Sequence, residues 1–346
     1  MQRDIKLIRF ITLRYADPIC AIDLSDKYLL YGTMLGTAAC YLINQKKLIT
    51  LSETQEEHIS GVKIQDDQKE NKLYVCVGDE KILIYNSINE NDDNIKQIEK
   101  GNYQSENEHF QKCEKSFTML KNDYLVRTFI EFPPDTKTSY NVFDTQVSIK
   151  NIINSIESEK TEIIKMSNYC VPHDFDGKNY IFVDFIEEKN RIFYIYDLDN
   201  NNIRKKVELD KEKIGHISLC KILNDELIFL VRSYNICEIR DFNFNLKRYF
   251  NYNGNEILAF DIIYTDENNF DSLKIIILDL NCNVFLYHYK NDKLEYWFNL
   301  ENLNIEQVIK DQRFFSMGYP YYIKVSKQYL AISSDYGCLL LQHSPL

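Results

Sequence analysis

The residues best spaced for metal chemistry lie in one acidic stretch near the middle of the chain. Asp197, Asp199 and Asn201 alternate along it, and Glu208 lies eleven residues after Asp197. Helix–loop–helix calcium sites place their oxygen ligands at these loop positions. Such a loop needs glycine at its sixth position, where this chain has Asn202, and flanking helices, whereas the flanks here read as strands. Asp and Asn tolerate left-handed backbone, so we predict a hairpin turn and no metal site.

A second stretch brings a histidine beside two carboxylates. His173, Asp174 and Asp176 precede Gly177, and acid–base chemistry uses such groups when they converge in a cleft. Neighbours along a loop do not show convergence, so we predict a polar turn before a strand. The other histidines, which lack metal-ligand spacing, are His58, His109, His216, His288 and His343. The chain has no phosphate-cradling glycine loop and no GxSxG turn. We therefore expect no catalytic residues, no metal ligands and no cofactor.

Composition limits the class of protein and of partner. The chain has 346 residues and a formal net charge of -11, which argues against a phosphate-tracking surface and hence against nucleic acid as the main partner. Its nine cysteines are scattered without a CxxC pair, which is typical of reduced, buried thiols in a cytosolic compartment. No apolar run approaches the ~18 residues of a membrane span. We expect a cytoplasmic protein with no membrane insertion.

The elements that would position these residues are copies of one β unit, clearest near the two ends of the chain. Val325–Gln342 reads as a polar turn, an apolar strand, a tight turn and a second apolar strand, and Leu24–Leu42 has the same layout. Two further copies begin near residues 121 and 223, and weaker copies begin near residues 71, 177 and 272. This makes seven copies at a spacing of roughly 45 to 56 residues, close to the period of a propeller blade.

Each copy predicts a second strand after its turn, and short polar turns predict antiparallel sheets. These strands are Thr37–Leu42, Lys81–Tyr85, Tyr140–Phe143, Arg191–Tyr196, Ile236–Arg240, Asn283–Tyr287 and Cys338–Gln342. The final unit lacks a fourth strand, whereas Ile5–Leu13 is an unassigned strand at the other end. We therefore predict an all-β fold, a single seven-bladed propeller domain over 1–346. In it, the N-terminal strand 5–13 completes the C-terminal blade 321–342 and closes the ring.

Three stretches are longer than the repeat requires. The polar stretch 87–114 predicts a flexible loop. Residues 146–165 carry isoleucines at helical spacing, which favours a small helix or the outer strand of the third blade over a helix dedicated to a partner. Residues 301–315 predict a short helix before the last blade. Such insertions are expected on the rim, where repeat proteins vary for binding.

The ends of the second strands carry a family resemblance. Tyr196-Asp197 and Phe143-Asp144 are similar to the aromatic-plus-acid ending of a WD repeat, and the Ser-Ser-Asp-Tyr-Gly turn at 333–337 is similar to the family's second hairpin. The chain resembles WD40-repeat or WD40-like β-propellers over nearly its whole length. It departs from them in having no Trp-Asp pair and only one Gly-His, Gly215-His216. The resemblance implies a scaffold whose ring faces and rim hold partner proteins, with no catalytic residues.

The sequence favours a non-catalytic protein-interaction scaffold, a subunit of a larger assembly, over two other functions. One is a propeller enzyme with a site in its central channel. The other is a lipid- or phosphate-recognising propeller, although the segment nearest to a phosphoinositide-binding element, 238–242, lacks its Phe-Arg-Arg-Gly core. A small-molecule partner is not expected. A cytoskeletal or ciliary assembly is the setting expected if the source cell is ciliated.

Overall fold

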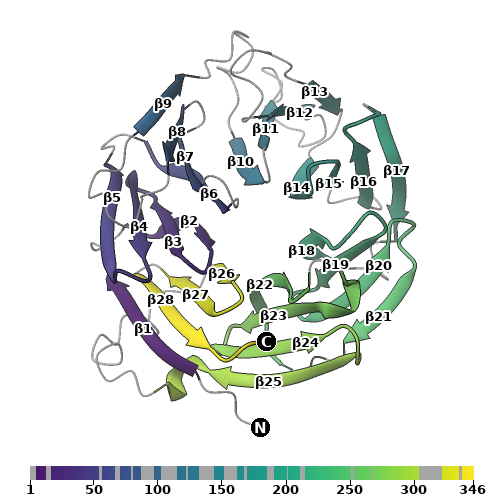
Figure 1. The fold of residues 1–346 in the computed structure, drawn as a ribbon. Coiled ribbons are helices and arrows are strands. Elements are labelled where there is room, and N and C mark those ends of the chain that lie inside the picture. Colours follow the sequence, from purple (N-terminus) through teal and green to yellow (C-terminus); the bar gives the residue numbers. More distant parts are fainter. Residues whose placement is uncertain are drawn as a thin grey trace. The chain divides into compact units, whose positions relative to one another are not determined.

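The structure of the protein is a computed structural model, and Figure 1 shows its fold. It describes residues 5–12, 17–53, 57–66, 71–78, 81–86, 97–102, 115–121, 124–131, 144–151, 162–166, 170–184, 191–200, 202–210, 215–250, 252, 254–266, 268–303, 322–334 and 337–346. The chain forms two compact units, which are described separately below. The first unit combines residues 1–103 with 253–346, and the second consists of residues 104–252.

The first unit contains four antiparallel sheets of four strands each in its described part. One sheet has the order β2(Ile19–Leu24), β3(Tyr28–Thr33), β4(Thr37–Leu42) and β5(Lys47–Glu53). The next has β6(Ile59–Asp66), β7(Asn71–Val77), β8(Lys81–Asn86) and β9(Gln97–Asn102). A third has β22(Ile257–Tyr264), β23(Leu273–Asp279), β24(Asn283–His288) and β25(Lys293–Asn299). The fourth, which we call the terminal sheet, has β26(Tyr322–Val325), β27(Tyr329–Ser334), β28(Gly337–His343) and β1(Ile5–Thr12).

The second unit has three antiparallel sheets of four strands among its described residues. The first is built from β10(Lys115–Lys121), β11(Tyr124–Glu131), β12(Asp144–Asn151) and β13(Glu162–Met166). The second is built from β14(Cys170–Phe175), β15(Asn179–Asp184), β16(Arg191–Asp197) and β17(Asn202–Leu209). The third is built from β18(Ile217–Ile222), β19(Leu227–Arg232), β20(Ile236–Asp241) and β21(Leu246–Phe250). The all-β fold class predicted from the sequence is confirmed.

The predicted pairing between the two ends of the chain is also present. β1 runs antiparallel to β28, with Ile11 opposite Cys338 and Phe10 opposite Leu339. The turn residue Gly337 permits this pairing, because a Cβ atom there would overlap the backbone carbonyl oxygen of Ile11. The side chain of Ile11 is buried, 4% exposed. β1 is therefore an integral outer strand of the terminal sheet.

Apolar side chains join neighbouring sheets face to face, as each sheet would otherwise leave two apolar faces in water. In the first unit, one cluster joins the β22–β25 sheet to the terminal sheet, with Leu286 and Leu339 among its members. Another joins the terminal sheet to the β2–β5 sheet through residues such as Leu340 and Tyr41. A third lies between the β2–β5 and β6–β9 sheets. In the second unit, a similar cluster joins the β14–β17 and β18–β21 sheets.

A buried aspartate on the first strand of one sheet bonds to the first strand of the next. The Asp23 carboxylate accepts a hydrogen bond from the backbone N–H of Ile64 at 2.8 Å. It also lies 3.1 Å from the Lys63 amine. Because Asp23 is on β2 and the other two are on β6, these contacts fix one sheet against its neighbour. We call this arrangement the aspartate bridge.

The aspartate bridge recurs in both units. The Asp261 carboxylate on β22 accepts from the N–H of Val325 on β26 at 3.0 Å, with the Lys324 amine 3.8 Å away. In the second unit, Asp174 on β14 accepts from the N–H of Ile222 on β18 at 2.8 Å. All three aspartates are buried. The repeat therefore includes a polar contact between sheets as well as apolar packing.

Two of the predicted insertions contain strands. The stretch 87–114, expected to be a flexible loop, includes β9, which pairs with β8 and completes its sheet. Backbone pairing makes a strand of this polar sequence, because an outer strand needs little apolar surface. The third strand of the β10–β13 sheet was expected at Tyr140–Phe143 but is β12, Asp144–Asn151, with β13 outside it. The described residues of 146–165 thus belong to β12 and to the outer strand β13, whereas residues 152–161, which carry most of the isoleucines at helical spacing, lie outside the described part.

The short helix expected at 301–315 falls mostly outside the described residues. Within the described part, a single 3-10 turn, η3 (Leu300–Asn302), follows β25. Its first turn is capped by Asn299, whose side-chain oxygen accepts from the N–H of Glu301 at 2.7 Å.

Candidate functional site

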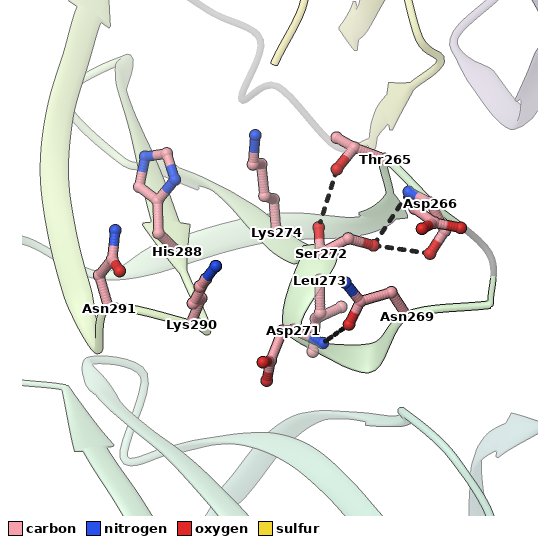
Figure 2. A pocket seen from close by; sticks show the side chains of 10 residues that line it. All are labelled: Thr265, Asp266, Asn269, Asp271, Ser272, Leu273, Lys274, His288, Lys290 and Asn291. Atoms are coloured by element: carbon pink, nitrogen blue, oxygen red, sulfur yellow. Dashed lines mark hydrogen bonds between the residues drawn. The ribbon is translucent and has the colours of Figure 1, made fainter.

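A surface pocket of about 380 Å³ lies at one end of the β22–β25 sheet, and Figure 2 shows its lining. One wall is the loop between β22 and β23, with Thr265, Asp266, Asn269, Asp271 and Ser272. The rest comes from the start of β23 and from the end of β24 with the turn that follows, where Leu273, Lys274, His288, Lys290 and Asn291 lie. Nine of these ten residues are polar or charged, so the pocket suits a polar ligand.

Hydrogen bonds within the β22–β23 loop fix its shape. The Ser272 hydroxyl donates to the backbone carbonyl of Asp266 at 2.7 Å and accepts from the Asp266 N–H at 3.0 Å. The Asn269 side chain accepts from the N–H of Asp271 at 3.0 Å and caps the 3-10 turn η2 (Phe270–Ser272). Asn, Asp and Ser favour such turns because their side chains bond to nearby backbone. The local sequence therefore builds this wall.

An aromatic contact ties the same loop to the far side of the pocket. The ring of Phe270 meets Tyr289 edge to face, with centroids 4.6 Å apart, and lies 6.1 Å from the ring of Tyr264. The Tyr289 N–H also donates to the backbone carbonyl of Leu273 at 3.1 Å. An edge-to-face pair contributes about 0.5–1.5 kcal/mol beyond the area it buries. The two walls are thus held together before any ligand arrives.

Basic side chains form a row across three strands beside the pocket. Lys274 on β23 is directly opposite His288 on β24, and His288 is directly opposite Lys293 on β25. Directly opposite residues in antiparallel strands have Cβ atoms about 4.5–5.5 Å apart. Glu295 balances part of this charge, with one carboxylate oxygen 2.9 Å from His288 Nε2 and the other 3.1 Å from the Lys293 amine. The hydrogen bond from His288 lowers the pKa of Glu295.

Two charged groups of the lining make no polar contact with the part of the chain that the structure describes. The Lys290 amine has no ion-pair or hydrogen-bond partner there, and neither has the Asp271 carboxylate. Figure 2 shows the two side chains on separate elements, Lys290 after β24 and Asp271 on the β22–β23 loop. The pocket therefore offers one cation and one anion, both exposed, to a ligand.

The acidic stretch at Asp197 forms a hairpin turn between β16 and β17. The Asp197 carboxylate accepts hydrogen bonds from the backbone N–H of Asn200 at 3.2 Å and from the Asn200 side-chain amide at 2.9 Å. The hydrogen bond from the Asn200 side chain lowers the pKa of Asp197. Asp197 is paired with Asn202, whereas Glu208 is paired with Ile192. Five residues along a strand span about 17 Å. Asp197 and Glu208 are therefore too far apart to bind one ion.

The stretch at His173 is divided between a strand and a turn. His173 and Asp174 lie in β14, not in the polar turn that the sequence predicted, because Asp174 forms the aspartate bridge to β18. Asp176 alone shapes the turn, accepting from the N–H groups of Lys178 at 2.8 Å and Asn179 at 2.6 Å. Burial, and then the nearby charge of His216, lower the pKa of His173 to about 4. These residues do not converge on a pocket.

The pocket was missed by sequence reasoning, which considered metal-ligand spacing, a histidine beside carboxylates, and known catalytic and phosphate-binding motifs. Of its residues, only His288 was named, as a histidine without such spacing. The turn-forming run from Asp266 to Ser272, followed closely by Lys274, was a usable signal for a structured polar loop. The pairing of Lys274 with His288 was not accessible, because it depends on the register of two strands.

The described part of the chain contains no group of three or more His, Cys, Asp or Glu side chains placed to hold a metal ion. Among the described residues, no helix has both the length and the apolar character needed to cross a membrane.

Comparison with known proteins shows likeness of fold without likeness of sequence. No family model and no curated protein sequence matches the chain. Raptor from Chaetomium thermophilum is similar with a TM-score of 0.63 at 8% identity, over 99% of this chain and 29% of that one. YCF48, solved bound to a D1 peptide, has a TM-score of 0.57 at 8% identity, over 100% of this chain and 96% of that one. The computationally designed protein Ika8 has a TM-score of 0.56 at 6% identity, over 97% of this chain and 99% of that one.

The chain thus spans less than a third of the Raptor chain. Identities this low show the fold alone. Together with the all-β sheets described above, this likeness of fold is consistent with a β-propeller.

Proposed function

We propose that this chain is a non-catalytic protein-interaction scaffold that holds a segment of a partner protein within a larger assembly. The pocket on the β22–β25 sheet carries the proposal. Its lining is polar, its walls are fixed by hydrogen bonds and by the Phe270–Tyr289 contact, and two of its charged groups are exposed. A small-molecule site is usually lined mainly by apolar side chains, whereas a polar, exposed pocket suits the side chains of a peptide.

The comparisons support an interaction role of this kind. YCF48, which has a similar fold, was solved with a peptide bound. We extend that role to this chain as a hypothesis, because the fold by itself does not determine function.

The proposed platform is a single ring of seven blades, one for each four-stranded sheet. In this arrangement β1 locks the ring by completing the terminal sheet, which thus combines strands from both ends of the chain. A closed ring leaves only short outer edges exposed. Small-angle X-ray scattering of the purified chain tests the ring: a compact disc-like particle is expected, and an elongated particle of separated units would contradict it.

The scaffold role is tested by the state of the protein in its native cells. The tagged full-length chain is purified under gentle conditions, and its mass is measured by size exclusion with light scattering. A stoichiometric complex with other proteins, identified by mass spectrometry, is the expected result. Recovery of the chain as a lone monomer at low salt would contradict the proposal.

A further inference from the structure

We propose that the pocket on the β22–β25 sheet recognises a partner segment that carries both an acidic and a basic side chain. The acidic side chain lies beside Lys290 and the basic row, and the basic one lies beside Asp271. This inference rests on the proposed scaffold function and names the chemistry of the segment that one site accepts.

The acid-binding half follows from the register of the sheet. Lys274, His288 and Lys293 are directly opposite one another on three adjacent strands. Lys290, in the turn that follows β24, adds another cation. Like charges directly opposite each other on strands destabilise a sheet, and Glu295 offsets part of this charge through its contacts with His288 and Lys293. An acidic side chain entering the pocket gains attraction from this row in a protein whose net charge is -11.

The base-binding half follows from Asp271. This residue is exposed on the η2 turn, and its N–H is used by Asn269. Its carboxylate has no partner among the described residues, unlike Asp266, whose carboxylate accepts from the N–H of Asn268 at 3.1 Å. Lys290 and Asp271 both line the pocket but do not form an ion pair with each other. A segment with both charges satisfies both groups at once.

The fixed geometry of the site makes this recognition selective. The Ser272 hydroxyl bonds and the contact of Phe270 with Tyr289 hold the loop in place, so that little conformational entropy is lost on binding. The spacing between the two charges of the ligand is therefore dictated by the pocket. Because both interactions are exposed, we expect affinity to fall as ionic strength rises.

The experiment uses the full-length chain, immobilised and panned with a display library of random octapeptides. We expect the enriched peptides to share one acidic and one basic residue at a constant separation. A fluorescent copy of the most enriched peptide then serves as the probe for Kd measurements. Absence of enrichment, or an enriched motif without both charges, overturns the proposal.

Charge reversals assign each half of the motif. Lys290→Glu and Asp271→Lys are each expected to weaken binding of the probe by tenfold or more. The double variant is expected to bind a probe with its two charges exchanged. Lys327→Glu and Asp225→Lys, which make the same changes at exposed positions outside the pocket, serve as matched controls. Equal binding by pocket and control variants overturns the proposal.

Failure of this inference is distinguishable from failure of the scaffold function. If partner proteins from native cells co-purify equally with the wild-type chain and with the double variant, the scaffold stands and the pocket is not its binding site. If the wild-type chain is a lone monomer in those cells, the scaffold function fails whatever the peptides show.

Discussion

Replacing Asp23 with alanine tests whether the aspartate bridge stabilises the first unit. The substitution removes the carboxylate that accepts a hydrogen bond from the buried N–H of Ile64 at 2.8 Å. Leaving a buried donor without a partner costs about 1–3 kcal/mol. The ion pair with Lys63 is also lost, and because that amine is partly exposed it adds only about 0.2–1 kcal/mol. We therefore expect a loss of about 1.2–4 kcal/mol in the free energy of unfolding.

The single tryptophan makes this measurable in the unit concerned. Trp297 lies on β25 in the first unit and is 7% exposed, so its fluorescence reports unfolding of that unit. With a urea slope of about 3 kcal/mol per molar, the midpoint of Asp23→Ala should fall by about 0.4–1.3 M. Asp23→Asn keeps an oxygen acceptor for Ile64 and should lose less than half as much.

The control for this test is Asp271→Ala, because Asp271 is exposed and lies in the same unit as Asp23 and Trp297. A surface change of this kind normally alters stability by less than about 0.5 kcal/mol. If Asp23→Ala unfolds at the same urea concentration as the control, the aspartate bridge contributes nothing and the reasoning is refuted. Asp261→Ala offers a second bridge in the same unit, for which a similar loss is expected.

Four further outcomes are expected. Deleting residues 1–14 removes β1, whose apolar side chains contribute about 1.5–3 kcal/mol each when fully buried, so the shortened chain should melt at a much lower temperature or aggregate. Deleting only residues 1–3 is the control. An unchanged melting temperature after deletion of residues 1–14 would contradict the pairing. Ile11→Cys should form a disulfide with Cys338 on mild oxidation, seen on non-reducing gels, because directly paired strand residues have Cα atoms close enough; wild-type chain without this band is the comparison. Burial opposes ionisation of Glu238, but hydrogen bonds from two arginines outweigh this effect and lower the pKa of Glu238 from 4.5. Wild type should therefore be more stable than Glu238→Gln by its full margin above pH 4.5, and this margin should shrink as the pH falls below 4.5. A difference in unfolding free energy that stays constant with pH would argue against the shift. Millimolar Ca²⁺ should leave the melting temperature unchanged, whereas a rise of several degrees would show an ion bound at the Asp197 turn.

Most strands were predictable because each begins after a polar turn and is apolar. β4 matches the predicted range Thr37–Leu42, and β20 extends the predicted range Ile236–Arg240 by one residue. β12 was missed although Val147 and Ile149 alternate with polar residues at period two. The aromatic residues just before it favoured an earlier strand, at Tyr140–Phe143. β9 was missed because its polar sequence carries almost no apolar signal. Backbone pairing, which the sequence does not display, makes it a strand.

The candidate site and the aspartate bridges were beyond the reach of sequence reasoning. Asp23 and Ile64 are 41 residues apart, and nothing local indicates that a strand-end aspartate turns toward the next sheet. The pocket needs the register that places Lys274 opposite His288, and it also needs the ring contact of Phe270 with Tyr289. Turn chemistry predicts a structured loop, but tertiary packing decides what that loop faces.

The pairing of β1 with β28 has a consequence for how the protein is made. β1 leaves the ribosome long before its partner β28, because most of the described sheets lie between them in the sequence. At about 5–20 residues per second, the interval between them is on the order of tens of seconds. Throughout that time β1 is an unpaired strand, able to associate with other nascent chains. Lys6 and Arg9, both exposed in the finished sheet, place charge within its apolar sequence and so discourage premature association until the terminal sheet can form.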